Sequence, residues 1–469
     1  MKPLFKTCYE LDKRCYNKYN LTEDILMEHA SMGIERYIRE HFKKGSSVLI
    51  VCGVGNNGAD GITLARLIES DYRVMLYVPF GVKSQMAKLQ LDRVKRLGVE
   101  IVSDIREADI IVDAIFGAGL SRELDEKTRE LIVKLEALDG FKIACDIPTG
   151  IDVNGNPLPM AFIADVTITM GALKEALYSD MAKDFVGEII CVDLGVSFKR
   201  YTEGFETDIY LLEESDFRPP NRDFSKNTHK RTFGHLAVIM GERDGAGVLC
   251  ATSALRFGAG LVSVVGEMFC SVPISIMHDL DIPPKTTAIA LGMGFGDNFY
   301  SDIIDEVLEH KAPIVLDADI FKSERVLEFL EQKERDIVLT PHPKEFVSLW
   351  NMSIEESIDI SYLQANRFNK VREFCMLFPH ITLVLKGANM IIAKGDKLFV
   401  NPYGTVKLSK GGSGDVLTGI ISSLLAQGWS GLASAISGSL ALAFSASLYN
   451  GADFSMLPTD LIDNLSKLK

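Results

Sequence analysis

Short, continuous apolar runs alternate with amphipathic segments along the first half of the chain. Apolar runs of this length are typical of strands buried on both faces, and amphipathic segments are typical of helices that cover those faces. The pattern predicts an α/β domain built on a doubly wound parallel sheet. The predicted strands are Val48–Cys52, Val74–Val78, Ile110–Ala114, Ile143–Cys145, Val166–Thr169 and Ile189–Val192, and the predicted helices span 61–70, 84–97 and 122–137.

A further helix is predicted ahead of this alternation, over Leu21–Phe42. Thr22 stands where it can cap the helix, and the two acidic residues that follow suit its positive end. Ile25, Leu26 and Met32 are expected on its apolar face.

The alternation is interrupted near the middle of the chain and then resumes. Arg218–Asp223 and the polar run Ser225–Arg231 indicate a linker or an irregular crossover, so we place the boundary near 212–225 and expect domains at 1–212 and 225–469. The second α/β domain is predicted to have strands at Leu236–Met240, 261–265, 288–291, 313–316, 336–339 and 381–385, followed by a hairpin of Met390–Ala393 and Leu398–Val400.

One stretch near the C-terminus imitates a membrane span, because Val416–Ala452 contains no charged residue. The segment Gly428–Gly431 divides it, and the second piece carries several serines. Two buried, closely packed helices explain this composition better than a membrane span.

Composition narrows the function further. The chain has 469 residues, which favours two domains, and its formal charge of −14 argues against nucleic-acid and membrane partners. Its eight cysteines form no C-x-x-C pair. Because Cys52, Cys145 and Cys191 lie in strand-like runs, we expect buried free thiols, a reducing compartment and a cytoplasmic protein.

The first candidate site is the loop Gly53–Gly61, which follows a predicted strand and opens a helix. Glycines and a helix N-terminus favour an anionic ligand, although a ligand-free tight turn has the same outline. Polar clusters also lie at the ends of three later strands, at Asp113–Leu120, Asp146–Asp152 and Gly171–Lys174. Because parallel strands end at one edge of a sheet, these four loops are predicted to line one crevice.

Oxygen-bearing side chains in these loops suit a hard cation such as an alkali ion; those concerned are Asn57, Asp113 and Thr149. Helix capping is the structural alternative for Asp113 and for Asp146. Asp146 and Lys174 are our candidates for proton transfer, and a solvated lysine is the alternative for Lys174.

These motifs resemble the NAD(P)H-hydrate epimerase domain over about residues 1–210. The resemblance implies a Rossmann-like fold and interconversion of the R and S epimers at the hydrated C6 of the nicotinamide ring. It also implies K⁺ at Asn57, Asp113 and Thr149, and Ala59 stands where the family usually has glycine, which would cost about 1 kcal/mol if the backbone there is left-handed. The implied substrate-binding residues are Asn56, Asn57, Gly58, Ala59, Asp60, Gly117, Ala118, Gly119, Leu120, Ser121, Arg122, Glu123 and Asp146.

The sharpest motif in the chain is Lys410–Gly419, Lys-Gly-Gly-Ser-Gly-Asp-Val-Leu-Thr-Gly. Its glycines precede a helix, where free amides can hold a transferring phosphoryl group, and Asp415 can accept the proton of an attacking hydroxyl. A glycine-rich loop whose aspartate merely suits the helix dipole is the alternative. Two companion segments fit the same chemistry: Leu339–Glu345, in which proline-flanked His342 is either a ligand or a structural loop residue, and Val384–Met390 with Lys386.

Together with Gly245–Gly247, Leu255–Leu261 and Gly292–Gly296, these motifs resemble the NAD(P)H-hydrate dehydratase domain over about 225–469. The resemblance implies a ribokinase-like fold and Mg²⁺ with ADP, with ATP as the alternative donor. Hydrated nucleotide is implied at Ala246, Gly294, His342 and Asp415, and adenine nucleotide at Lys386, Gly387, Ala388, Asn389, Met390 and Gly414. Two departures are Lys344 in place of glycine and Gly241–Arg243 in place of Gly-Gly-Ser.

The combined expectation is a bifunctional enzyme that repairs hydrated nicotinamide nucleotides and forms a homo-oligomer. Two other hypotheses remain at this point. A vitamin or sugar kinase would explain Asp415 but not the first domain, and a catalytically silent first domain would tolerate Asp146→Asn and Lys174→Ala.

Overall fold

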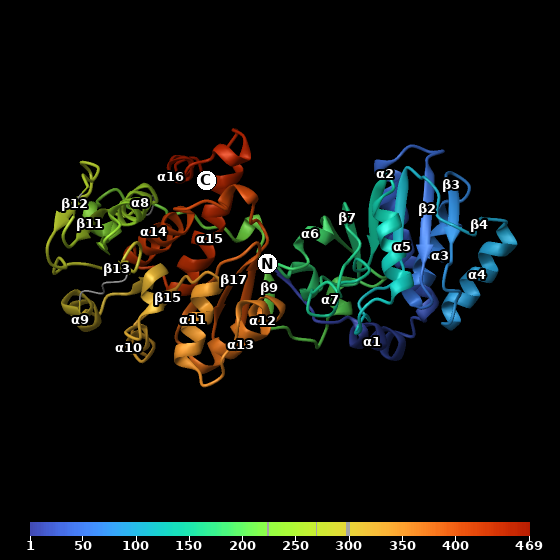
Figure 1. The fold of residues 1–469 in the computed structure, drawn as a ribbon, viewed down its shortest axis with the longest axis horizontal. Coiled ribbons are helices and arrows are strands. Elements are labelled where there is room, and N and C mark those ends of the chain that lie inside the picture. Colours follow the sequence, from blue (N-terminus) through green and yellow to red (C-terminus); the bar gives the residue numbers. More distant parts are fainter. Residues whose placement is uncertain (223–224, 269, 297–300) are drawn as a thin grey trace. The chain divides into compact units, whose positions relative to one another are not determined.

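The computed structural model describes residues 1–222, 225–268, 270–296 and 301–469 (Figure 1). The chain forms two compact units: Pro3–Thr207 is the first unit, and Asp208–Lys469 with Met1–Lys2 is the second. Residues of the expected crossover join the second unit, where strand β9 (Ile209–Leu211) pairs in parallel with β18 (Lys397–Asn401). Asp223, which belongs to the predicted linker, lies outside the described residues.

The first unit contains a seven-stranded sheet in the order β4-β3-β2-β5-β6-β7-β8, and all its pairings are parallel. Counted from β2, this order is 3-2-1-4-5-6, the Rossmann order, with one further strand, so the predicted doubly wound α/β class is confirmed. Short and mostly exposed β4 escaped the prediction because it offers almost no apolar run. The strands are β2 (Ser47–Cys52), β3 (Arg73–Tyr77), β4 (Glu100–Val102), β5 (Ile110–Ala114), β6 (Phe141–Cys145), β7 (Val166–Met170) and β8 (Glu188–Val192).

Helices cover both faces of this sheet (Figure 1). The strand β2 shows how: Val48 and Ile50 belong to one apolar cluster, whereas Leu49 and Val51, on the opposite face, belong to another. Cys52 and Cys145 are buried as predicted, but Cys191 is exposed because it lies on edge strand β8, which has only one neighbour. The helices are α1 (Tyr9–Tyr19), α2 (Glu23–His41), α3 (Asn56–Ile68), α4 (Gln85–Leu97), α5 (Glu126–Glu136), α6 (Lys183–Val186) and α7 (Phe198–Tyr201), with a 3₁₀ turn η1 at Glu175–Tyr178.

Two details of helix α2 differ from prediction. Thr22 takes the N-cap position, but its side chain accepts no capping hydrogen bond. Ile25 and Met32 are 39% and 40% exposed, so the buried stripe is shifted and includes Leu26 and Ile34 instead. Ideal helical spacing identified the helix, but it did not fix which side packs on the sheet.

The second unit has a mixed sheet in the order β9-β18-β17-β16-β15-β14-β13-β10-β11-β12, with the short strand β1 (Lys2–Pro3) beyond β9. The run from β12 to β16 is parallel, and β17 and β18 form the predicted antiparallel hairpin. This sheet confirms the α/β class of the second domain. The remaining strands are β10 (His235–Ile239), β11 (Leu261–Val265), β12 (Met277–Asp279), β13 (Ala288–Leu291), β14 (Ile314–Leu316), β15 (Ile337–Leu339), β16 (Thr382–Leu385) and β17 (Met390–Lys394).

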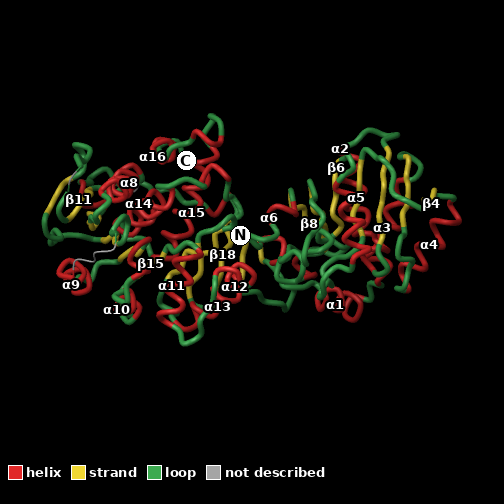
Figure 2. Tube along the Cα trace, in the orientation of Figure 1, coloured by secondary structure: helices red, strands yellow, loops and turns green. Residues whose placement is uncertain are grey.

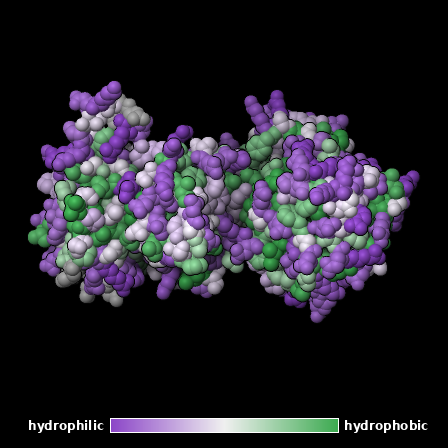
Figure 3. All heavy atoms as spheres, turned by 90° about the horizontal axis from the view of Figure 1, so that it is seen from above, coloured by the Kyte–Doolittle hydropathy of each residue, from purple (hydrophilic) through white to green (hydrophobic). Residues whose placement is uncertain are grey.

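The long uncharged stretch forms two buried helices, α14 and α15, as predicted (Figure 2). No helix in the described part of the chain is long and apolar enough to span a membrane. On the face shown in Figure 3, hydrophilic residues are interspersed with apolar ones. The helices of this unit are α8 (Asp244–Arg256), α9 (Ser301–Glu309), α10 (Val326–Leu330), α11 (Pro343–Ser353), α12 (Ile360–Ala365), α13 (Arg367–Leu377), α14 (Ser413–Ala426), α15 (Gly431–Ser447) and α16 (Pro458–Leu465).

Candidate active sites

The first unit has a cavity of about 630 Å³ whose wall includes residues that follow β2, β5, β6 and β7. The four loops expected to share one crevice therefore do meet. The lining residues from these loops are Val54, Gly55, Asn56, Asn57, Asp60, Ile115, Phe116, Gly117, Ala118, Gly119, Leu120, Asp146, Met170 and Lys174. Predicted residues Ser121, Arg122 and Glu123 lie outside this wall and are exposed.

An ion pair joins the two predicted proton-transfer residues, with Lys174 Nζ 2.7 Å from Asp146 Oδ1. The lysine is only 2% exposed, so the solvated alternative is wrong. Its ammonium also donates to Thr169 Oγ1 at 2.8 Å and to the Met170 carbonyl at 2.9 Å. Burial lowers the pKa of Lys174, but the attraction of Asp146 outweighs it and holds that pKa above its ordinary value. Lys174 is therefore a fully engaged cation that fixes Asp146.

Asp146 itself is placed by an unusual backbone, with a left-handed φ of 69°. Its Oδ1 also accepts from the Met170 amide, whereas its Oδ2 faces Gly117. A Cβ on Gly117 would lie 3.3 Å from that Oδ2 and 3.0 Å from Asn57 Oδ1, which explains why a glycine stands there. One oxygen of Asp146 is thus anchored, and the other is directed toward the loop that lines the cavity.

The candidate cation ligands lie beside this cavity. Asp113 is 0% exposed, and Thr149 binds both of its oxygens at 2.7 Å, through its amide and through its hydroxyl. Burial raises the pKa of Asp113 to about 6, against the opposing effect of the Thr149 hydrogen bonds. Among the described residues, no basic side chain pairs with Asp113, and the buried Asn57 side-chain nitrogen has no partner.

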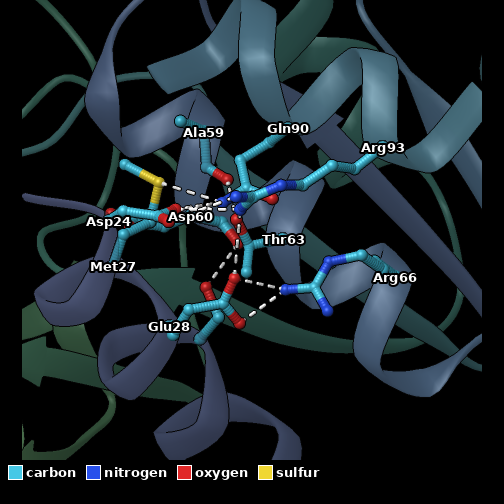
Figure 4. Close-up of polar contacts among 10 residues, drawn as sticks. Asp24, Met27, Glu28, Ala59, Asp60, Thr63, Arg66, Gln90 and Arg93 are labelled. Carbon is cyan, nitrogen blue, oxygen red and sulfur yellow. Dashed lines mark hydrogen bonds and ion pairs between the residues drawn. The ribbon is translucent and has the colours of Figure 1, made fainter.

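Helix α2 forms another wall of the cavity, through Glu23, Leu26, Met27 and Ala30. Figure 4 shows how charged residues tie this helix to α3 and α4. Arg93 binds both oxygens of Asp24, Gln90 donates to the same carboxylate, and Arg66 pairs with Glu28. The wall is therefore held to the helix that begins with Asn56 and carries Asp60.

In the second unit, a group of polar residues gathers where β14, β15 and β16 end. These parallel neighbours are followed by Asp317, His342 and Lys386, respectively. Lys386 Nζ lies 2.7 Å from Asp317 Oδ1, and Thr418 of α14 donates to Asp317 Oδ2 at 2.8 Å. The N-terminus of α14 closes this arrangement, since a Cβ on Gly414 would lie 3.4 Å from Lys386 Nζ.

Asp415 lies in the first turn of α14, after Gly412, whose φ is 97°. Burial and the negative charge of Asp317 raise the pKa of Asp415 to about 6, and Lys386 partly opposes this rise. Within the described chain, the Gly414 and Asp415 amides have no backbone acceptor, and buried Ser413 Oγ has no hydrogen-bond partner. Free amides beside a carboxylate are the arrangement predicted for phosphoryl transfer.

His342 is the N-cap of α11 and forms a reciprocal capping box with Glu345. Burial raises the pKa of Glu345 to about 7, against the attraction of Lys386, whose Nζ lies 3.9 Å away. Burial and the Lys386 charge lower the pKa of His342, which favours a neutral imidazole. His342 thus combines a structural cap with a position beside the lysine.

The other predicted ligands of this site are those expected to bind the hydrated nucleotide and those expected to bind the adenine nucleotide. Gly294, with φ of 63°, packs on Ala246, because a Cβ there would lie 3.0 Å from the Ala246 Cβ. Gly387 and Ala388 are exposed, whereas Asn389 is buried. Lys386 and Gly414 lie close together, since a Cβ on Gly414 would be 3.4 Å from Lys386 Nζ.

The sequence reasoning missed several polar residues of both sites. Asp317 could have been found, because it directly follows a predicted strand, as Asp146 does. Asp12 and Tyr16, which line the first cavity from α1, had no such signal, because α1 buries only Leu11 and Cys15 along its length.

Comparison with known proteins shows which family contains both of these units. Residues 236–467 match the family model described as NAD(P)H-hydrate dehydratase, and residues 23–176 match the model described as YjeF-related protein N-terminus. A bifunctional NAD(P)H-hydrate repair enzyme from Helicobacter pylori is 40% identical over 485 residues, covering 100% of each chain. This chain belongs to the bifunctional NAD(P)H-hydrate repair enzymes.

A second family member and a solved structure are also similar to this chain. The Escherichia coli member is 30% identical over 94% of this chain and 89% of its own. Among solved structures, the ADP/ATP-dependent NAD(P)H-hydrate dehydratase from Bacillus subtilis co-crystallized with ATP/Mg²⁺ is 25% identical, covers 53% of this chain and 92% of its own, and gives a TM-score of 0.45.

Three segments depart from the repair-enzyme motifs, and each lies in a different part of the fold. Ala59 lies in right-handed helix α3 and is fully buried, so the anticipated cost of a left-handed alanine does not arise. Lys344 is exposed in the first turn of α11. The Arg243 amide donates to the Gly294 carbonyl at 2.9 Å, and the Glu242 carboxylate lies against Gly296. Two charged side chains thus border the Gly294–Gly296 turn.

Proposed function

We propose that the first unit interconverts R- and S-NAD(P)HX and that the second unit dehydrates S-NAD(P)HX to NAD(P)H, with ADP or ATP as phosphoryl donor. The supporting observation is that each unit gathers a separate set of family-motif residues at the carboxyl edge of its own parallel sheet. Asp146 and Lys174 form a buried pair in one unit, and Asp415 lies beside Lys386 and Asp317 in the other. Two complete sites of different chemistry favour two consecutive reactions over a silent first domain.

In the epimerase reaction, C6 of the hydrated ring bears a hydroxyl and is bonded to the ring nitrogen. We assign the hydroxyl proton to Asp146 Oδ2, the oxygen that Lys174 does not hold. As that proton leaves, the C6–N bond breaks, the nitrogen gains a proton, and C6 becomes an aldehyde. Closure on the opposite face reverses these transfers and yields the other epimer. Lys174 holds Asp146 in place through its other oxygen, Oδ1.

Potassium is the cation we propose for Asn57, Asp113 and Thr149. The donor set fits, because it offers oxygens around a buried carboxylate that no basic side chain of the described residues neutralises. The Asn57 amide also fits, since its side-chain nitrogen has no hydrogen-bond partner among the described residues. A bound K⁺ would supply the missing positive charge beside the loop that carries Gly117.

In the dehydratase reaction, we assign Asp415 as the general base for the C6 hydroxyl. Its raised pKa, about 6, makes the carboxylate a better base that is still ionised at neutral pH. The hydroxyl oxygen attacks the terminal phosphoryl group of the nucleotide, and the Gly414 and Asp415 amides stabilise the charge on that group. Lys386 is placed to attract the same phosphates.

Phosphorylation solves the leaving-group problem, because phosphate leaves far more readily than hydroxide. Electron donation from the ring nitrogen expels phosphate, and loss of a proton from C5 restores the dihydropyridine ring. Mg²⁺ would enter with the nucleotide and offset part of its charge. Ala246, Gly294 and His342 are proposed to hold the hydrated nucleotide, and Lys386–Met390 with Gly414 the adenine nucleotide.

The proposed function is tested by absorbance at 340 nm, with purified full chain, mixed-epimer NADHX, Mg²⁺, K⁺ and either ADP or ATP. Recovery of nearly all the NADH with one nucleotide is expected and identifies the donor. Recovery of the S fraction alone, beyond spontaneous epimerisation, would contradict the epimerase assignment. No recovery with either nucleotide would favour a small-molecule kinase.

We also propose a cytoplasmic homo-oligomer whose partners are small molecules rather than nucleic acid or membranes. The buried free thiols Cys52 and Cys145 support a reducing compartment. Light scattering on the purified chain would test the oligomeric state, and a monomer at micromolar concentration would contradict it.

A further inference from the structure

Helix α1 brings Asp12 into the wall of the first cavity, although it lies outside the segment, 23–176, that the family model matches. Its hydrogen-bond partner, Tyr201, also lies outside that segment. The Tyr201 hydroxyl donates to Asp12 Oδ1 at 2.6 Å. Two segments from opposite ends of the first unit therefore meet to place one carboxyl group at the cavity.

Tyr201 is held firmly enough to position this carboxyl group. It is 1% exposed, and its ring and hydroxyl pack against Gly171, where a Cβ would lie 2.5 Å from the hydroxyl oxygen. Gly171 has a φ of 75° and connects β7 to the segment that carries Lys174. The same turn thus supports both the Lys174–Asp146 pair and the Asp12–Tyr201 pair.

The chemistry of ring opening leaves one role unassigned. Protons must move at two atoms, the C6 oxygen and the ring nitrogen, and Asp146 is assigned to the oxygen. Lys174 is a poor second group, because Asp146, Thr169 and the Met170 carbonyl engage its ammonium. A second proton-transfer group should line the cavity and keep a polar atom free for the substrate.

Asp12 meets these requirements. Tyr201 occupies its Oδ1, and Oδ2 has no hydrogen-bond partner in the described part of the chain. The charged groups that act on it are Lys174 after β7, Asp146 after β6 and Glu23 on α2. Besides burial, Asp12 in turn raises the pKa of Asp60 on α3 and of the nearby Cys8 and Tyr16. Burial raises the pKa of Asp12 despite the Tyr201 hydrogen bond and the Lys174 charge, so this carboxyl group retains a proton more readily than an exposed aspartate does.

We propose that Asp12, held by the Tyr201 hydroxyl, is the second proton-transfer residue of the epimerase site. Its proton passes to the ring nitrogen as the C6–N bond breaks, and returns to Asp12 when the nitrogen attacks the other face of the aldehyde. Asp146 takes and returns the hydroxyl proton, so the cycle leaves both residues unchanged. This inference rests on the proposed epimerase function.

The test uses full-length Asp12→Asn and Tyr201→Phe variants with separated R- and S-NADHX. Turnover of the S epimer reports the second unit and should stay at the wild-type value. Turnover of the R epimer at saturating ADP and Mg²⁺ should fall about 100-fold in Asp12→Asn, with KM within about threefold of wild type, because general acid–base groups contribute about 10²–10⁴-fold. The basic limb of the wild-type pH profile, where Asp12 loses its proton, should disappear.

Tyr201→Phe should keep measurable R-epimer turnover but shift that limb, because the carboxyl group loses its hydrogen-bond donor. Glu10→Gln is the matched control: Glu10 is exposed on the same helix and does not line the cavity, so its profile should match wild type. Asp12→Glu, which keeps a carboxyl group, should recover part of the lost rate. Far-UV circular dichroism checks that the first unit of each variant is folded.

R-epimer turnover in Asp12→Asn within threefold of wild type, with both pH limbs intact, would overturn the proposal. A rise in KM alone would also overturn it, because it would make Asp12 a binding residue. If the wild-type chain itself fails to turn over the R epimer above the spontaneous rate, the proposed epimerase function fails instead.

Discussion

Each unit of this repair enzyme has a buried lysine–aspartate pair at the carboxyl edge of its sheet, but the two pairs have different tasks. Lys174–Asp146 and Lys386–Asp317 both measure 2.7 Å from nitrogen to oxygen. In the first unit, the aspartate of the pair is the proposed proton-transfer group. In the second unit, the aspartate is covered by Thr418, and the proposed base is Asp415, on the adjoining helix.

The two aspartates differ in how many of their carboxylate oxygens are already engaged by neighbouring side chains. Asp146 keeps Oδ2 directed toward Gly117 on the cavity wall, whereas both oxygens of Asp317 have partners and its side chain is 1% exposed. A buried ion pair is therefore no mark of catalysis by itself. The residue we propose for proton transfer in the first unit is the one whose second oxygen faces the cavity wall.

The largest effect expected from this comparison is on Asp415, the proposed base of the second unit. Asp415→Asn should lower S-epimer turnover by about 10³-fold, within the range for loss of a general base, because an amide cannot accept the hydroxyl proton. Epimerisation by the same variant should be unchanged, since the first unit is intact. NADH formation at 340 nm measures the first effect, and chromatographic separation of the epimers measures the second.

Asp317→Asn gives the matched test of the other aspartate. This variant keeps the shape of the residue and the Thr418 contact. Any loss of S-epimer turnover should therefore reflect weaker nucleotide binding through Lys386 more than impaired proton transfer. A fall in kcat as large as that of Asp415→Asn, with an unchanged KM for ADP, would reverse the roles we assign.

Next in size is the cost of breaking the first ion pair. Lys174→Met should destabilise the first unit by about 3–5 kcal/mol, because it leaves a carboxylate partly buried without its partner. Both tryptophans, Trp350 and Trp429, lie in the second unit, so their fluorescence follows that unit, whereas far-UV circular dichroism follows both. In urea, the circular dichroism transition should broaden toward lower concentration while the fluorescence transition stays in place. Coincident, wild-type-like transitions would show that the pair contributes little to stability.

The proposed potassium site predicts a further difference, because K⁺ should affect the first unit and not the second. K⁺ should raise the thermal midpoint of the first unit relative to a bulky organic cation, because it neutralises buried Asp113. Asp113→Asn should remove this response and lower epimerisation about tenfold, while S-epimer turnover keeps its rate. A K⁺-dependent thermal shift that survives in Asp113→Asn would place the ion elsewhere.

The pH dependence of the second unit gives a smaller, sharper test. A base must be ionised, so kcat/KM for the S epimer should fall as pH drops through about 6, the pKa of Asp415, by about tenfold per unit below it. Because Lys386 opposes the rise in that pKa, Lys386→Gln should move the limb to higher pH. A shift to lower pH, or no limb below pH 7, would contradict the assignment.

Much of the fold could be predicted from the pattern of apolar residues. Strands with continuous apolar runs were found almost to the residue, as at Ile110–Ala114, because burial on both faces leaves few polar positions. Helix α1 and strand β4 were missed, since each buries only one or two residues. The predicted start of α3 was late, because Asn56–Asp60 was interpreted as a loop although it forms the first turns of the helix.

Site residues could be predicted where a sequence motif follows a strand. They could not be predicted where only tertiary packing brings them to the cavity. Asp146 and Lys174 were chosen from sequence, but their mutual contact depends on the left-handed backbone at Asp146. Asp12 and Tyr201 are 189 positions apart, and no local pattern announces their hydrogen bond. Ser121–Glu123, implied by resemblance alone, is exposed and outside the cavity wall.

The smallest expected effect concerns Lys344, which stands where the family usually has glycine. Lys344 is exposed two residues from His342 and adds positive charge near Lys386, which should attract an anionic nucleotide. Lys344→Gly should therefore raise the KM for ADP about twofold to threefold, leave kcat unchanged, and lose its effect in about 0.5 M salt, where exposed charges are screened. Lys311→Gly is the matched control, because Lys311 precedes β14 and so lies at the opposite edge of the sheet. A salt-independent change in kcat would mean instead that Lys344 acts through the α11 cap, and the charge of the second site would then matter less than its geometry.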